Sequence, residues 1–162
     1  MTEVKFYDHA EDRLLKFAVI ISRSNGQWVF CKHKERNTFE VPGGHREKGE
    51  MILDTAKREL KEETGAVDFT IKPVCVYSVK GKTRVNENLD DETFGMLYFA
   101  DIFSFEEIHS EIEKIVLMDE LAENWTYPLI QPKLIDEARH RVLFNETNYL
   151  KHLDLFLSAR RR

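Results

Sequence analysis

The alternation of apolar and polar residues divides the start of the chain into strands and turns. Residues 14–23, LLKFAVIISR, form an almost continuous apolar run, which is typical of a buried strand. An Asn-Gly pair follows and tolerates the positive φ angles of a tight hairpin, so residues 27–33 are expected to return as a second strand. Residues 39–41 form a short extended piece that ends at the Pro-Gly-Gly turn of residues 42–44.

Apolar residues at helical spacing predict a helix from about residue 51 to residue 64. Ile52, Ala56 and Leu60 recur four residues apart and are expected to face the core. Gly65 follows the last of these positions, where glycine commonly adopts the left-handed conformation that ends a helix. The segment is therefore expected to be a helix with one apolar face and a defined end.

The rest of the chain continues with strand patterns and ends with helical ones. The expected elements are one or two strands over 67–79 bent at Pro73, a polar loop over 80–92, a strand over 93–103, an acidic segment over 105–114 that is irregular or briefly helical, a strand over 115–118, and helices over 133–143 and 146–158. This order predicts an α/β (α+β) fold in which a mixed β-sheet carries helices on both faces.

Length and composition limit the possible classes of protein. A chain of 162 residues fits one domain, 1–162, with a sizeable core. The net charge of -5 provides no general basic field for nucleic acid, so phosphate binding would need local cations. No apolar run approaches the roughly 20 residues of a membrane helix, and the first residues lack the apolar core of a signal peptide. Cys31 and Cys75 are expected to be reduced core residues, which favours a cytoplasmic protein.

Charged residues on the predicted 51–64 helix carry the candidate chemistry. Glu59, Glu62 and Glu63 are three and four residues apart and share a face, and Arg58 can pair with Glu62. Neighbouring carboxylates repel one another unless a cation lies among them, and Mg²⁺ prefers oxygen ligands that it shares with water and phosphates. Taken alone, the segment is more typical of a charged, solvated helix surface than of a metal site.

The full spacing of residues 44–66, GHREKGEMILDTAKRELKEETGA, favours the first interpretation. It resembles the Nudix box of the Nudix hydrolase family: a glycine, a glutamate six residues later, then the REL-x-EE-x-G pattern. The last box position is usually a larger aliphatic residue and is Ala66 here, a departure at a packing position. The resemblance implies an α/β/α sandwich and hydrolysis of a nucleoside diphosphate linked to another group.

The resemblance also implies roles for residues in and around the box. Metal ligands would be Glu59, Glu62, Glu63 and the carbonyl of Gly43, with Mg²⁺ as the ion and Mn²⁺ as a possible substitute. Arg58 would orient a carboxylate, while Gly44, Glu50 and Gly65 would shape the loop and the helix. The general base in this family is a box glutamate or a glutamate on a later loop. Glu111 is the chosen later candidate, and an acidic loop without a role is the alternative.

Substrate recognition is less clearly marked than the metal site. Phe39, Asn124 and Trp125 combine stacking groups with an amide and are candidates for contacting a base, although a core role for Trp125 explains the pattern equally well. The first expectation is a small nucleotide, namely a nucleoside triphosphate of the 8-oxo-dGTP type that is converted to the monophosphate and pyrophosphate. The protein is expected to act without nucleic acid or membrane, as a monomer or homodimer.

Several other functions fit the same residues. The alternatives are cleavage of ADP-ribose, nucleotide sugars or dinucleoside polyphosphates, removal of pyrophosphate from RNA 5′ ends, a catalytically inactive nucleotide-sensing module, and a protein that metal stabilises without catalysis. The sensing module is disfavoured because every box acid is present.

Overall fold

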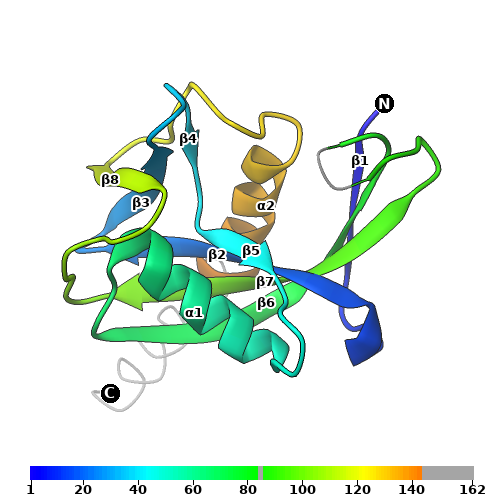
Figure 1. Ribbon diagram of the computed structural model, residues 1–162, viewed down its shortest axis with the longest axis horizontal. Helices are drawn as coiled ribbons and strands as arrows, with labels where there is room; N and C mark the ends of the chain where they lie inside the picture. Colours follow the sequence, from blue (N-terminus) through cyan, green and yellow to red (C-terminus); the bar gives the residue numbers. More distant parts are fainter. Residues whose placement is uncertain (84–85, 144–162) are drawn as a thin grey trace, which may run out of the picture.

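A computed structural model describes residues 1–83 and 86–143 and shows a mixed sheet between two helices (Figure 1). The strands are β1 (Glu3–Tyr7), β2 (Leu15–Ser24), β3 (Gln27–His33), β4 (Phe39–Glu40), β5 (Gly43–His45), β6 (Phe69–Lys80), β7 (Glu92–Ile102) and β8 (Ile112–Met118). The helices are α1 (Ile52–Thr64) and α2 (Gln131–Ala138), with a 3-10 turn at Asp12–Leu14 and a π-helical turn at Arg139–Leu143 after α2.

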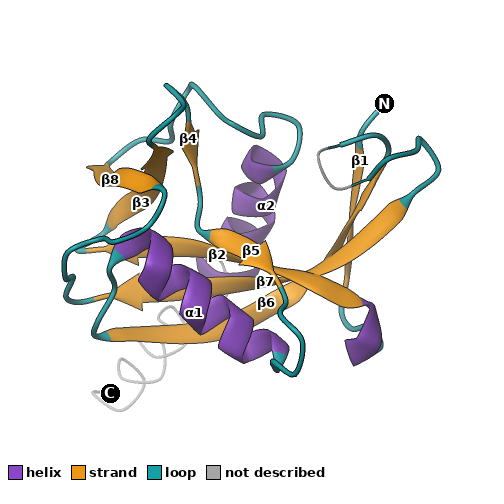
Figure 2. Ribbon diagram, in the orientation of Figure 1, coloured by secondary structure: helices purple, strands orange, loops and turns teal. Residues whose placement is uncertain are grey.

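The sheet order is β1-β6-β7-β2-β3-β4, with β5 paired to β2 and β8 paired to β3. The β2–β7 pair is parallel, with Ile20 beside Tyr98, and every other strand pair is antiparallel. β2 is buried at both faces, as its apolar sequence predicts, because helices cover the sheet above and below it. Figure 2 shows β1 at one end of the sheet and β3 with β8 at the other.

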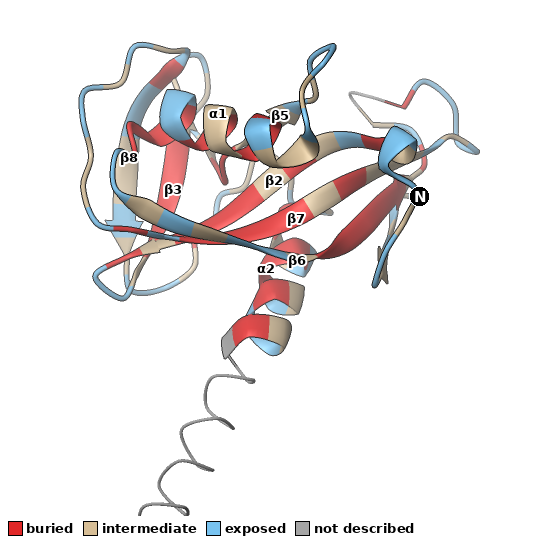
Figure 3. Cartoon of the chain, turned by 90° about the horizontal axis from the view of Figure 1, so that it is seen from below, coloured by how far each residue is buried: buried red, intermediate tan, exposed pale blue. Residues whose placement is uncertain are grey.

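The two helices lie on opposite faces of the sheet (Figure 3). α1 packs Ala56 and Leu60, which are fully buried, against Ala18 and Ile20 of β2. On the other face, α2 buries Leu134, Ile135 and Ala138 against Ile21, Leu97 and other core residues. The expected α+β sandwich with a mixed sheet is therefore confirmed.

Several element boundaries differ from the expectation. β1 was not expected from the sequence, and β8 begins at Ile112, inside the segment expected to be irregular. β6 is one strand whose pairing shifts between Pro73 and Cys75. α2 starts at Gln131, and the expected helix over 146–158 lies outside the described residues. None of the helices in the described part of the chain is long and apolar enough to span a membrane.

Candidate active site

The turn that leads into α1 places two glycines against the sheet. β5 pairs Gly43 with Val19 and Gly44 with Ala18, and the Ile20 amide donates to the Pro42 carbonyl at 2.9 Å. A Cβ atom on Gly44 would lie 2.2 Å from Oε1 of Glu59. Glycine is therefore required at this position because a carboxylate of α1 occupies the space that a side chain would fill.

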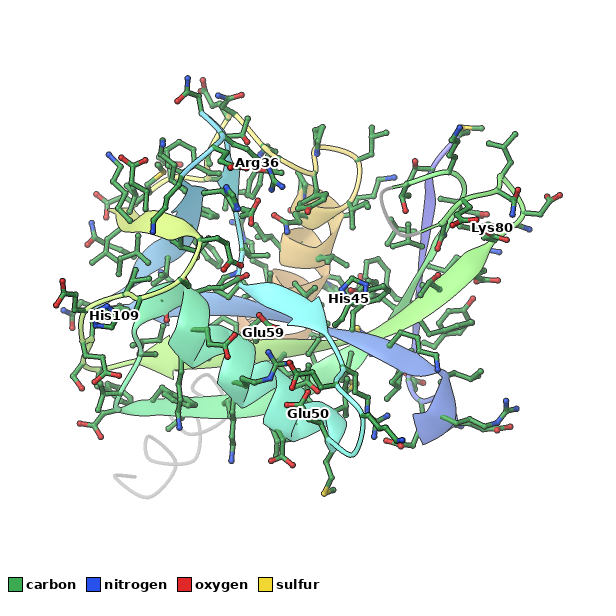
Figure 4. All side chains as sticks on the ribbon, viewed as in Figure 1. Arg36, His45, Glu50, Glu59, Lys80 and His109 are labelled. Carbon is green, nitrogen blue, oxygen red and sulfur yellow. The ribbon has the colours of Figure 1, made fainter. Side chains whose placement is uncertain are left out.

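Glu50 and Arg58 form a two-pronged ion pair beside the first turns of α1 (Figure 4 labels Glu50). Arg58 donates from Nε to one Glu50 oxygen at 2.9 Å and from a terminal nitrogen to the other at 3.0 Å. Glu50 also accepts hydrogen bonds from the Glu47 amide at 2.8 Å and the Thr55 hydroxyl at 3.2 Å. Together these donors lower the pKa of Glu50 from 4.5 to about 2, and the hydrogen bond from Arg58 contributes most to that shift.

Arg58 connects the pair with the rest of the box. Its guanidinium donates to Glu59 at 2.7 Å, to the His45 carbonyl at 3.1 Å and to Glu62 at 3.4 Å. These bonds raise the pKa of Arg58, with Glu50 contributing most. Glu50 is thus the main partner of Arg58, while the expected pair with Glu62 is a longer, secondary contact. Arg58 fixes the loop, the helix and one carboxylate relative to one another.

Glu59 and Glu63 are buried acids on the face of α1 that meets the glycine turn (Figure 4 labels Glu59 there). Burial raises the pKa of Glu63 to about 9, against the lowering effect of a 3.0 Å hydrogen bond from the Gly43 amide. Burial also raises the pKa of Glu59, and the charges of Glu62 and Glu111 add to that rise. Both carboxylates are costly to ionise, and a bound cation would remove much of that cost.

These groups suit a divalent metal ion. Glu59, Glu63 and the backbone of Gly43 lie together through the contacts described above, and they supply the oxygen ligands that Mg²⁺ prefers. The Glu62 side chain lies beside them and is 54% exposed. Within residues 1–83 and 86–143, no three His, Cys, Asp or Glu side chains already converge as a metal-ligand cluster.

Two further acids surround Glu63. The charge of Glu111 contributes to the raised pKa of Glu59 and Glu63, and its backbone carbonyl accepts the Lys34 amide at 3.0 Å. Glu40 is buried, bonds to Arg36 at 3.1 Å and also raises the pKa of Glu63. Glu40 was not predicted as a site residue. Its only signal in the sequence is its position as an acid within the apolar stretch before the Pro-Gly-Gly turn.

A buried thiol lies directly beneath this part of α1. Cys31 of β3 is fully buried, and its Sγ–H donates to the Glu63 carbonyl at 3.5 Å. Burial, followed by the nearby acids, raises the pKa of the Cys31 thiol well above its usual range. Cys31 and Cys75 are both buried free thiols, as the sequence predicts.

Phe39, Asn124 and Trp125 are joined by framework contacts. The Phe39 amide donates to the Asn124 carbonyl at 2.8 Å, and the Asn124 side chain donates to the Asn37 carbonyl at 2.6 Å. The Trp125 ring packs edge-on against Phe30 with ring centres 5.3 Å apart. These three residues fasten β4 to the segment before α2, and none of them lines the cavity described next.

A cavity of about 230 Å³ opens beside the glycine turn, between β2, β5, β6 and the start of α2. It is lined by Phe17, Val19, Glu40, Val41, Gly43, Gly44, His45, Tyr77, Val79, Thr83, Tyr127, Ile130, Gln131 and Leu134. The lining includes Gly43 and Gly44, so the cavity adjoins the buried carboxylates. Gln131 lies in no motif, so no sequence signal marks it as a residue of this cavity.

Comparison with known proteins supports the same interpretation. The family model described as NUDIX domain matches residues 12–137, most of the chain. The chain belongs to the Nudix family. The match includes the glycine turn, α1 and the start of α2, so the carboxylates and the cavity both lie within the Nudix domain. Nudix proteins generally use divalent metal cations, in agreement with the acids that α1 buries.

Individual Nudix relatives agree with this assignment. "Putative 8-oxo-dGTP diphosphatase YtkD" of Bacillus subtilis (strain 168) is 35% identical over 124 residues, covering 75% of this chain and 73% of that protein. The crystal structure of a mutant of the Bacillus subtilis pyrophosphohydrolase BsRppH superposes with a TM-score of 0.68 at 27% identity, covering 86% and 90% of the two chains. A NUDIX hydrolase from Nitrosomonas europaea shares the fold, with a TM-score of 0.61 at 18% identity over 78% and 89%. The chain is a Nudix pyrophosphohydrolase.

Proposed function

We propose that the protein hydrolyses a nucleoside triphosphate of the 8-oxo-dGTP type in a Mg²⁺-dependent reaction. The observation that carries the proposal is the pair of buried acids, Glu59 and Glu63, beside the Gly43 backbone at the mouth of a cavity. The choice of substrate is supported by the relative whose name describes an 8-oxo-dGTP diphosphatase. Water would break the α–β phosphoanhydride bridge, and nucleoside monophosphate and pyrophosphate would leave.

The proposed metal ligands are Glu59, Glu62, Glu63 and the Gly43 carbonyl. A bound Mg²⁺ or Mn²⁺ supplies charge neutralisation on the phosphates and a lowered pKa for water. Arg58 holds Glu59 in place through their 2.7 Å contact and uses Glu50 as its own anchor. Gly44 leaves room for the Glu59 carboxylate. Gly65, at φ 74°, directly follows Thr64, the last residue of α1, and ends the helix.

Glu111 is the proposed general base. Its charge is felt by both Glu59 and Glu63, so its carboxylate lies near the acids that would hold the metal. An ionised carboxylate in this position can accept the proton of the attacking water. A Glu111→Gln variant is expected to lose turnover while keeping metal affinity, and unchanged turnover would remove Glu111 from the mechanism.

A substrate panel tests the proposed reaction. The panel contains canonical and oxidised deoxynucleoside triphosphates, ADP-ribose, a nucleotide sugar, a dinucleoside polyphosphate and an RNA with a 5′-triphosphate, each with Mg²⁺, Mn²⁺ or EDTA. Chromatography should show a nucleoside monophosphate and pyrophosphate from an oxidised or canonical triphosphate. EDTA should abolish the reaction, and added Mg²⁺ should restore it.

The same panel can contradict the proposal. Preference for ADP-ribose, a nucleotide sugar, a dinucleoside polyphosphate or RNA would replace the proposed substrate with that compound. Hydrolysis of no compound would favour a nucleotide-sensing module over an enzyme. Sedimentation analysis would distinguish a monomer from a homodimer.

A further inference from the structure

Two polar side chains in the cavity have groups that the protein leaves unpaired. Tyr77 of β6 is 4% exposed and Gln131, the first residue of α2, is 6% exposed, and both line the cavity. Within the described residues, the Tyr77 hydroxyl and the Gln131 amide nitrogen make no hydrogen bond to the protein. Both atoms open onto the cavity and are not among the fully enclosed unpaired atoms of the described residues. A ligand that fills the cavity and excludes water would have to provide hydrogen-bond partners for both, because an unpaired buried polar group is costly.

The orientation of the Gln131 amide is fixed from behind. The Val41 backbone amide donates to Oε1 of Gln131 at 3.0 Å. A backbone N–H can only meet an acceptor, so the amide oxygen must face Val41 and the NH₂ group must be the free end. Gln131 therefore presents only donors to a ligand, whereas the Tyr77 hydroxyl can either donate or accept.

The rest of the lining defines the body of the ligand. Val19, Val79, Ile130 and Leu134 give the cavity aliphatic walls, and the rings of Phe17 and Tyr77 add flat surfaces. Such walls suit a planar, largely apolar group with a few polar atoms on its edge, such as a nucleobase. Guanine-type bases carry acceptors at O6 and N7, while adenine carries an amino donor at position 6. A donor from Gln131 would pair with a 6-oxo group and be opposed by a 6-amino group.

We propose that Gln131 makes this enzyme select 6-oxopurine nucleotides over 6-aminopurine nucleotides. The inference rests on the proposed function, since it takes the cavity to hold the base of the substrate. It concerns position 6 of the purine and not position 8, so dGTP, dITP and 8-oxo-dGTP all carry the selected group. Tyr77 contributes a hydrogen bond without choosing between the two classes, because its hydroxyl can match either.

The first test compares kcat/KM of the wild-type protein for dGTP, dITP and dATP. We expect dGTP and dITP to exceed dATP by roughly 10- to 100-fold, the usual result of opposing one buried donor with another. Because dITP lacks the 2-amino group of dGTP, similar values for these two would locate the selection at position 6. Equal values for dATP and dGTP would overturn the proposal.

A variant with nearly the same shape sharpens the test. Gln131→Glu keeps an oxygen for the Val41 amide but replaces the NH₂ group with a second oxygen. At pH 8 we expect the ratio of dGTP to dATP in kcat/KM to fall at least about tenfold. Gln27→Glu, in the β3 hairpin strand, adds the same charge away from the cavity and should leave the ratio unchanged. An unchanged ratio in a folded Gln131→Glu protein would overturn the proposal.

Binding measurements separate this inference from the proposed reaction. Calorimetric titration with dGMP and dAMP needs no turnover, so it applies even if no triphosphate is hydrolysed. Tighter binding of dGMP without hydrolysis would refute the reaction and support the role of Gln131. Equal binding of dGMP and dAMP, together with hydrolysis of triphosphates, would support the reaction and refute the role of Gln131.

Discussion

The two sides of the sheet around the glycine turn hold side chains of opposite character. On the α1 side, charged groups from Glu50, Arg58, Glu59 and Glu63 bond to one another and to the turn. On the α2 side, apolar walls surround a cavity with two unpaired polar groups. The four charged residues lie within the 44–66 segment, whereas the cavity joins residues as distant in sequence as Phe17 and Leu134. Chemistry is encoded locally in this protein, and recognition is assembled by the fold.

The charged side also shows that position decides how an acid behaves. Glu50 lies just before α1 and Glu63 lies in its last turn, but the pKa of Glu50 is lowered to about 2 and that of Glu63 is raised to about 9. Arg58 and other donors surround Glu50, whereas burial dominates at Glu63. The ionised form of Glu50 is stabilised by its bonds to Arg58, whereas the ionised form of Glu63 is poorly stabilised unless a cation binds.

Removing the buried acid Glu63 should have the largest effect on activity, and the effect should be confined to the charged side of the sheet. Glu63→Gln is expected to lower kcat by about 100- to 1,000-fold, because it removes a charge aimed at the metal and phosphates. The metal-free variant should be at least as stable as the wild type, since a buried carboxylate is lost. Steady-state kinetics and thermal melts measure both quantities. Glu120→Gln, at an exposed position, is the matched control, and an active Glu63→Gln enzyme would contradict the assignment.

A change at Gly44 should disturb both sides, because this residue lines the cavity and touches Glu59. The added methyl group of Gly44→Ala would lie 2.2 Å from the Glu59 carboxylate and must displace it. We expect kcat to fall roughly 10- to 100-fold, since small displacements of catalytic groups are costly.

Gly26→Ala provides the control for a glycine replacement. Gly26 has φ 78° in the hairpin after β2, and a Cβ there meets nothing closer than 3.9 Å. This variant should lose about 1 kcal/mol of unfolding free energy and keep its activity. The assignment of Gly44 would be wrong if Gly44→Ala kept wild-type kcat in the same assay.

A change behind the cavity should alter recognition more than chemistry. A Cβ on Gly95 of β7 would lie 2.7 Å from the Tyr77 ring, so Gly95→Ala should push that ring toward the cavity. We expect KM to rise roughly tenfold, with an unfolding free energy lower by about 1–3 kcal/mol. The Mg²⁺ concentration needed for half-maximal activity should stay the same. A shift in that concentration would mean that the two sides are not separable.

The smallest expected effect is a dependence of stability on acid pH. The pKa of Glu50 is lower in the folded protein than its usual 4.5, so its contribution is complete above pH 4.5 and is lost as pH falls toward 2. Below pH 4.5 the contribution of Glu63, whose pKa is raised, is already complete and constant. Urea denaturation from pH 4.5 to pH 3 should therefore show decreasing stability in the wild type. Glu50→Gln should give a shallower decrease, and parallel curves would show that the Glu50–Arg58 pair contributes little.

The parts of the structure that the sequence predicted are those with local patterns. Helix α1 follows from apolar residues at helical spacing and ends at Gly65, and β2 follows from a long apolar run. β1 was missed because it is a short, half-exposed strand whose partner in the sheet, β6, is far away in sequence. Its order comes from pairing with β6, which a local pattern does not record.

The same limit applies to the candidate site. The box acids have a fixed spacing, but the role of Gln131 depends on Val41, ninety positions earlier, which only the fold brings within 3.0 Å. The Asn124-Trp125 pair has a composition typical of base recognition, yet Trp125 packs on Phe30. Composition alone does not separate a ring that packs in the core from a ring that faces a ligand.

The hydrogen bond between Cys31 and the Glu63 carbonyl gives the protein an internal reporter. A fully buried thiol with a raised pKa reacts with alkylating reagents only when the structure above it opens. In a protein whose other cysteine, Cys75, is replaced, the labelling rate of Cys31 would measure how often α1 separates from β3. Metal and nucleotide binding, which should hold α1 against the sheet, would then be visible as slower labelling without any added probe.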